Sequence, residues 1–165
     1  AIISDTLLFR SPTCTKTDKE IALELASIAG VDAEEFGLAM FKAGTSLVGK
    51  TIEEIYNQDY KVFNIGDAKV GIAQVNTMDI DGFAPLKGEM LEYMENLCVE
   101  NGFDAAVLLL TDVINATSEV FVAGTHPEYV ENAFNVQLVE HEANLPGVIS
   151  RKKQVVPAIT RAINA

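Results

Sequence analysis

The first part of the chain has the hydrophobic spacing of α-helices. Two stretches, 17–30 and 32–44, open with the capping-box patterns Thr17-x-x-Glu20 and Asp32-x-x-Glu35, and each ends in glycine. We therefore predict two consecutive helices here. Each helix has an apolar face at helical spacing: Ile21, Leu25 and Ile28 in the first helix, and Phe36, Ala39, Met40 and Ala43 in the second.

After a further short helix predicted from Thr51-x-x-Glu54, the apolar spacing changes to that of strands. Residues 60–64 and 68–77, separated by Ile65-Gly66-Asp67, predict a β-hairpin. The second arm is apolar on both faces, which is typical of a central strand. Three more strands are predicted, at 103–111, 118–123 and 136–141, and three more helices, at 85–101, at 127–134 and from Pro157 onward.

This alternation predicts an α/β fold. We expect a mixed sheet of about five strands with helices on both faces, preceded by a helical remnant of another domain. The joint Gly30-Val31-Asp32, between the first two predicted helices, is the best candidate for a domain boundary.

Composition and charge narrow the classes of function. The 24 acidic and 12 basic residues give a net charge of −12, which disfavours nucleic acid and anionic membrane surfaces as partners. The longest apolar run, 105–110, is far shorter than a membrane span. Cys14 and Cys98 have no framework spacing, so we expect a reducing, cytoplasmic location. The start, Ala1-Ile2-Ile3-Ser4-Asp5, has no basic segment and reads as the cut end of a longer protein.

The sharpest local reversal of this negative charge is Arg151-Lys152-Lys153. A guanidinium offers a planar fork of donors and an ammonium a compact charge, so the pair Arg151 and Lys152 suits a phosphoryl group, although a solvated basic turn has the same pattern. Asp5, within an apolar segment, fits either a local cap or a metal ligand or catalytic acid. Lys42 lies where a cation complements a helix dipole.

The common catalytic signatures are missing from the sequence. There is no dinucleotide-binding glycine motif, no complete phosphate-binding loop, no nucleophile elbow and no His-Glu-x-x-His motif. His126 and His141 stand alone, and each fits a surface or capping role better than metal ligation.

Four ordered segments carry a family resemblance that spans the chain: Ser4-Asp5-Thr6-Leu7-Leu8-Phe9-Arg10-Ser11-Pro12-Thr13, Phe41-Lys42-Ala43-Gly44-Thr45, Val70-Gly71-Ile72-Ala73-Gln74-Val75-Asn76-Thr77 and Ser150-Arg151-Lys152-Lys153-Gln154-Val155-Val156-Pro157. Together they resemble the C-terminal part of a family II inorganic pyrophosphatase. These enzymes belong to the DHH phosphoesterase superfamily and depend on manganese or cobalt.

The resemblance implies a role for each candidate residue. Asp5 corresponds to a ligand of the catalytic metal pair, Mn²⁺ or Co²⁺, and Mg²⁺ accompanies the substrate. Lys42, Arg151 and Lys152 correspond to residues that hold pyrophosphate oxygens. Residues 1–30 would be the tail of a missing metal-binding catalytic domain, and 31–165 the substrate-binding domain.

The Asp-His-His motif of the family is absent from this chain. We therefore expect no pyrophosphatase activity from the chain alone and no tightly bound metal ion. The expected partners are pyrophosphate and the missing N-terminal domain, within a full-length homodimer. Two alternatives are an exopolyphosphatase or related DHH-type phosphoesterase domain, and a non-catalytic interaction module that keeps only the fold.

Overall fold

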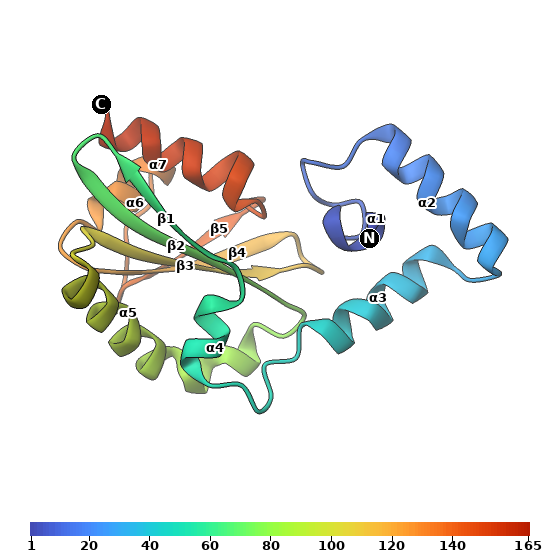
Figure 1. Cartoon of the computed structure of the whole chain (residues 1–165), viewed down its shortest axis with the longest axis horizontal. Coiled ribbons are helices and arrows are strands. Elements are labelled where there is room, and N and C mark those ends of the chain that lie inside the picture. Colours follow the sequence, from blue (N-terminus) through green and yellow to red (C-terminus); the bar gives the residue numbers. More distant parts are fainter. The chain divides into compact units, whose positions relative to one another are not determined.

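The computed structural model describes all residues, 1–165, and they form two compact units, Ala1–Ser46 and Leu47–Ala165 (Figure 1). The first unit contains the helices α1 (Ile2–Asp5), α2 (Lys16–Ala29) and α3 (Ala33–Gly44). The second contains the helices α4 (Ile52–Tyr56), α5 (Lys87–Asn101), α6 (Glu128–Phe134) and α7 (Val156–Ile163), and the strands β1 (Tyr60–Ile65), β2 (Ala68–Thr77), β3 (Ala105–Asp112), β4 (Thr117–Ala123) and β5 (Glu142–Pro146). No helix of the structure combines the length and the apolar character needed to cross a membrane.

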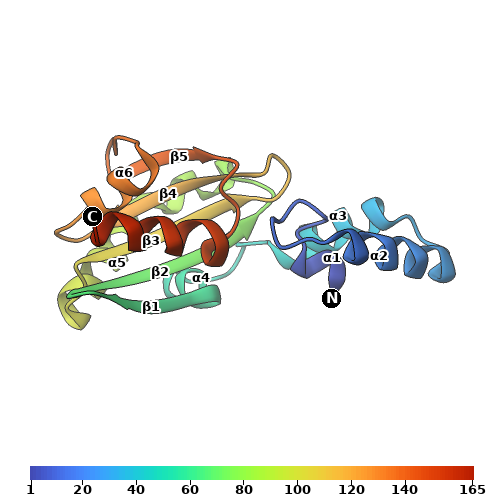
Figure 2. The ribbon, with the colours of Figure 1, turned by 90° about the horizontal axis from the view of Figure 1, so that it is seen from above.

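The second unit is built on one five-stranded sheet in the order β1-β2-β3-β4-β5. The central pair, β2 and β3, is parallel, and every other pair is antiparallel. Helices cover both faces, with α5 on one side and α6 and α7 on the other (Figure 2). The predicted α/β fold with a mixed sheet is therefore confirmed.

Each face of this sheet has its own hydrophobic core. Met90, Met94 and Cys98 of α5 pack on one face, as the predicted stripe of that helix requires. Val155 and Ile159 pack on the other face. All residues of β3 are buried because both faces of this strand are covered, which explains its uninterrupted apolar sequence.

The strand predicted at 136–141 is wrong, because the last strand is β5, at Glu142–Pro146. Asn135, Glu140 and His141 have left-handed backbone conformations, with φ of 52°, 51° and 71°, so the segment cannot run as a regular strand. Val136 and Leu138 instead pack from a loop against the core under α6 and α7, and the Leu138 N–H donates to Glu131 Oε1 at 2.9 Å.

Of the two long helices of the first unit, α2 begins earlier than predicted and α3 begins where predicted. The N-cap of α2 is Thr15, whose hydroxyl accepts from the Asp18 N–H at 3.1 Å, so the capping box lies two residues before the predicted Thr17-x-x-Glu20. Asp32 caps α3 as predicted. The left-handed C-cap of α2 is Gly30, with φ of 69°.

The apolar faces predicted for α2 and α3 are mostly exposed in the structure. Small residues, Ala22 and Ala26, are the buried positions of α2, whereas Leu25 is 53% and Ile28 is 77% exposed. In α3 the buried positions are Ala33, Gly37 and Phe41, and Phe36 is 52% exposed. Gly37 is needed there because a Cβ at this position would lie 2.3 Å from the Leu8 side chain.

Candidate phosphate-binding site

The Ser150–Val155 segment is a tight turn that leads into α7. Residues Arg151–Val155 form one π-helical turn, and Ser150 Oγ caps it by accepting from the Lys153 N–H at 3.2 Å. Gln154 Oε1 accepts from the Ile149 and Ser150 N–H groups at 2.9 and 3.0 Å. These bonds satisfy backbone donors that the turn would otherwise leave unpaired. The turn therefore has a fixed shape from which Arg151 and Lys152 project.

The Arg151 side chain is buried, with only 7% of the residue exposed. Its guanidinium Nη2 donates to Asp59 Oδ1 at 2.6 Å, and Nη1 donates to the Asp59 carbonyl and, at 3.2 Å, to the Ile72 carbonyl. A buried guanidinium is stable only when its charge and its donors are compensated, and Asp59 supplies both kinds of compensation. Arg151 is therefore not the solvated basic turn that its charged neighbours could suggest.

A buried row of polar side chains fixes the backbone at Arg151. The Gln74 side-chain amide accepts from the Arg151 N–H at 3.1 Å and donates to the Ile149 carbonyl at 3.0 Å. It also donates to Thr111 Oγ1 at 2.9 Å, which shares a hydrogen bond with Ser118 Oγ. One side chain from each of three neighbouring strands thus attaches the turn to the middle of the sheet. In the sequence, Gln74 stands out only as a member of the family segment 70–77, and no role could be assigned to it.

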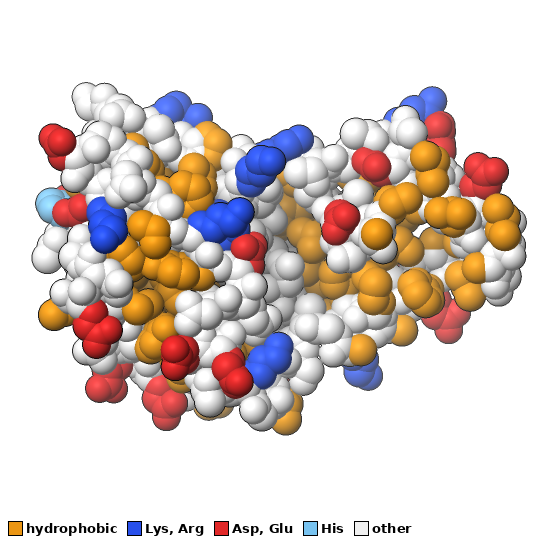
Figure 3. Space-filling model, in the orientation of Figure 1, with side chains coloured by type: hydrophobic (Ala, Val, Ile, Leu, Met, Phe, Trp, Pro, Cys, Tyr) orange, Lys and Arg blue, Asp and Glu red, His pale blue; other side chains and the backbone are white.

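Two cations accompany Arg151 in the second unit. Lys152 is exposed on the turn itself. Lys61, which sequence reasoning missed, pairs in the hairpin with Ile72, the residue whose carbonyl accepts from Arg151. Because side chains alternate along a strand, Lys61 shares the sheet face of Phe63, and Phe63 packs in the same core as Val155. Figure 3 shows Lys and Arg side chains gathered over the N-terminal end of α7.

The other two predicted site residues lie in the first unit. Lys42 is exposed in the last turn of α3. Asp5 is exposed at the end of α1, directly before a chain reversal in which Leu7, Leu8 and Phe9 all have positive φ. The chain contains no group of three or more His, Cys, Asp or Glu side chains that could hold a metal ion. Asp5 by itself does not make a metal centre, because a protein-bound manganese or cobalt ion needs several ligands.

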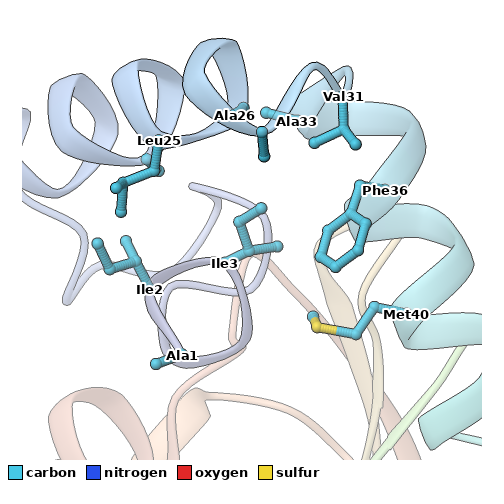
Figure 4. Close-up of a pocket in the computed structure, with 11 residues that line it drawn as sticks. Ala1, Ile2, Ile3, Leu25, Ala26, Val31, Ala33, Phe36 and Met40 are labelled. Atoms are coloured by element: carbon cyan, nitrogen blue, oxygen red, sulfur yellow. The ribbon is translucent and has the colours of Figure 1, made fainter.

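The first unit also carries an apolar pocket of about 430 Å³. Figure 4 shows Ile2, Ile3, Leu25, Phe36 and Met40 turned toward a common hollow between α1, α2 and α3. This pocket accounts for the exposed apolar faces of α2 and α3, because Leu25 and Phe36 line an open surface of their own unit instead of a closed core.

Comparison with known proteins shows which protein family the chain belongs to. The family model of the DHHA2 domain matches residues 38–162, and the chain belongs to this family. It is, more narrowly, similar to the C-terminal part of manganese- or cobalt-dependent family II inorganic pyrophosphatases, as the four motifs imply.

Individual relatives support this resemblance. The chain is 59% identical to a cobalt-dependent inorganic pyrophosphatase of Clostridium perfringens and 49% identical to the manganese-dependent inorganic pyrophosphatase of Bacillus subtilis, each over 99% of this chain. A crystal structure of a Methanococcus jannaschii protein assigned to the family II inorganic pyrophosphatases matches the whole chain with a TM-score of 0.89 and 46% identity. The chain spans only 30%, 53% and 54% of the lengths of these three relatives.

Proposed function

We propose that this chain is the substrate-binding C-terminal domain of a metal-dependent inorganic pyrophosphatase, which hydrolyses diphosphate to two phosphates. The observation that carries the proposal is Arg151, a buried arginine held from one side by Asp59 and the Ile72 carbonyl. A fixed guanidinium is suited to a phosphoryl group because its planar donors match two phosphate oxygens. Lys152 and Lys61 add positive charge for the remaining oxygens.

In this proposal the chain supplies the cations Arg151, Lys152 and Lys61, which we call the phosphate clamp. Another part of the full-length enzyme supplies most of the metal centre. Manganese or cobalt would activate the attacking water, and magnesium would accompany the substrate. Asp5 would contribute one metal ligand and Lys42 one substrate contact. The clamp cations would stabilise the charge that the leaving phosphate gains during hydrolysis. Because the chain offers this single ligand, Asp5, and no group of three or more side chains that could hold a metal ion, we expect no turnover by the isolated chain.

The proposed domain division places 1–30 in the metal-binding catalytic domain and 31–165 in the substrate-binding domain. The boundary between the two compact units falls after Ser46 in the sequence, and the DHHA2 match begins at residue 38. The open apolar pocket between α1, α2 and α3 supports the idea that a further domain covers this surface, since exposed apolar area of this kind is typical of an interface. A homodimer and a cytoplasmic location are the corresponding proposals for the full-length enzyme.

The first test is calorimetric titration of pyrophosphate, with magnesium present, into the isolated chain and its Arg151→Ala/Lys152→Ala variant. We expect binding by the first and loss in the second, because the clamp lies entirely within Leu47–Ala165. A Lys16→Ala/Arg161→Ala variant, which loses two exposed cations from other helices, is the matched control and should bind like the unaltered chain.

Equal binding by the chain and its Arg151→Ala/Lys152→Ala variant would support the non-catalytic module instead. For the full-length enzyme, the rates on pyrophosphate and short-chain polyphosphate separate a pyrophosphatase from an exopolyphosphatase. We expect faster turnover of pyrophosphate, and a preference for polyphosphate would contradict the proposal.

A further inference from the structure

The hydrogen bonds of Arg151 use a particular part of its guanidinium. Both N–H groups of Nη1 donate hydrogen bonds, one to the Asp59 carbonyl and one to the Ile72 carbonyl at 3.2 Å. One N–H group of Nη2 donates to Asp59 Oδ1 at 2.6 Å. Of the five N–H donors that an arginine carries, the Nε–H and the second Nη2–H form no hydrogen bond within the chain. Because Asp59 also accepts from Nη1, its Oδ1 takes the Nη2–H on the Nη1 side, and the two remaining donors lie in the guanidinium plane along its Nε/Nη2 edge.

The unused edge is open to a ligand. The buried side-chain nitrogen and oxygen atoms without a hydrogen-bond partner are Tyr56 Oη, Asn76 Oδ1 and Glu119 Oε2. Arg151 Nε is not among them, although it also has no partner, so this atom reaches the surface. Two parallel N–H donors on one edge match two oxygens of a phosphoryl group, in the bidentate arrangement that arginine forms with phosphate.

We propose that Asp59 is a positioning residue for substrate binding, which holds the end of the Arg151 guanidinium so that its Nε and Nη2 edge faces a phosphoryl group of pyrophosphate. This inference rests on the proposed function. Without the Asp59 carboxylate, Arg151 would keep only its two hydrogen bonds to the backbone carbonyls of residues 59 and 72, and the buried cation would lose its counter-charge. The guanidinium would then be free to rotate about its side-chain bonds and would present its fork less often.

A competing role for Asp59 predicts the opposite result. If the carboxylate occupied the place of a substrate phosphate, its removal would free Arg151 and strengthen pyrophosphate binding. The geometry argues against such competition, because Asp59 takes the end of the guanidinium and leaves the other edge unused. A phosphoryl group can therefore bind Arg151 while the ion pair stays intact.

The test uses the full-length enzyme with Asp59→Ala, Asp59→Asn and Asp67→Ala. Asp67 is an exposed carboxylate in the turn of the same hairpin and is the matched control for loss of a negative charge. The measurements are kcat and KM for pyrophosphate, and the Kd of non-hydrolysable imidodiphosphate by calorimetry. Circular dichroism melting checks that each variant is folded.

We expect Asp59→Ala to raise KM and the imidodiphosphate Kd by about 10- to 100-fold, the usual effect of losing a hydrogen bond to a charged group. Asp59→Asn keeps an acceptor at Oδ1 but loses the counter-charge, so its constants should lie between those of the unaltered enzyme and those of Asp59→Ala. Asp67→Ala should leave both constants unchanged. A purely structural defect would lower kcat through loss of folded enzyme and leave KM unaltered.

Two outcomes would overturn the role of Asp59: unchanged constants in Asp59→Ala, or tighter binding of imidodiphosphate. Arg151→Ala/Lys152→Ala in the full-length enzyme separates this failure from that of the proposed function. If that variant loses pyrophosphate affinity and Asp59→Ala does not, only the positioning role is wrong. If neither variant loses affinity, the pyrophosphate clamp itself is wrong.

Discussion

The two units of this chain treat their apolar residues in opposite ways. In Leu47–Ala165 large side chains such as Leu108 and Ile159 are fully buried between a sheet and its helices. In Ala1–Ser46 the buried helix positions are mostly small, and Leu25, Ile28 and Phe36 are more than half exposed. Figure 3 shows hydrophobic side chains spread over the surface of the first unit. The first unit therefore has an apolar surface that its own residues do not cover, whereas the second has a closed core.

The largest expected effect comes from truncating the closed core. Leu108→Ala, at a fully buried position of β3, should cost about 2–5 kcal/mol of the free energy of unfolding, because it removes apolar contacts and leaves a cavity. Leu25→Ala, at a position 53% exposed, should cost less than about 1 kcal/mol in the isolated chain. Chemical denaturation of both variants measures the difference. Equal losses would contradict the contrast between the units.

A smaller effect is expected from alkaline pH, and it belongs to the second unit. Burial raises the pKa of the Cys98 thiol to about 11, from an ordinary 9.0, and burial also raises the pKa values of Tyr56 and Tyr60. The unfolded chain thus loses these protons first. The associated stability is complete below about pH 9 and is lost as the pH rises through about 11.

Chemical denaturation at several pH values between 8 and 11 measures this loss of stability. The Cys98→Ala variant should have a shallower decline than the unaltered chain over this range, because it lacks one of the groups. Cys14→Ala, which removes a partly exposed thiol from the first unit, is the control. A decline as steep in Cys98→Ala as in the unaltered chain would contradict the contribution of the thiol.

The smallest expected effect tests the corrected start of α2. Thr15→Ala should cost about 1 kcal/mol of stability, because the Thr15 hydroxyl accepts from the Asp18 N–H and donates to the Asp18 carboxylate. Thr17→Ala removes the residue that the sequence pattern favoured, and it should be close to neutral. The thermal melting of both variants, followed by circular dichroism, compares them. A larger loss of stability for Thr17→Ala than for Thr15→Ala would support Thr17, the residue predicted from sequence, as the N-cap.

Sequence patterns predicted elements well where both faces of the element are covered. The hairpin, β3 and α5 are correct because their burial follows from the residues next to them in the sheet and its crossover. The burial of the apolar faces of α2 and α3 could not be predicted, because hydrophobic spacing indicates which side of a helix is apolar and not whether the chain covers it. The segment 136–141 was misread because its apolar residues alternate in a loop that is interrupted by left-handed residues.

The candidate site was predictable only in part. Arg151 and Lys152 stood out by local charge, and the family resemblance assigned them a role. Asp59 could not be found in this way, because its contact with Arg151 joins residues 92 positions apart. Lys61 had no signal until the strand register was known, and Gln74 has no neighbour in the sequence that suggests its contacts with Ile149 and Arg151. Asp5 and Lys42 lie in the first unit, and their proposed roles in metal and substrate binding remain predictions.

The long separation between Asp59 and Arg151 also bears on how the site forms during folding. Lys61 lies in the β1–β2 hairpin and Asp59 directly precedes it, so both belong to a local structure, whereas Arg151 follows β5 near the end of the second unit. Contacts between distant residues carry a high entropic cost of loop closure and slow the folding step that makes them. The phosphate clamp is therefore expected to form after the hairpin and to mark completion of the domain, so partly folded chains would have the sheet before they have a binding site.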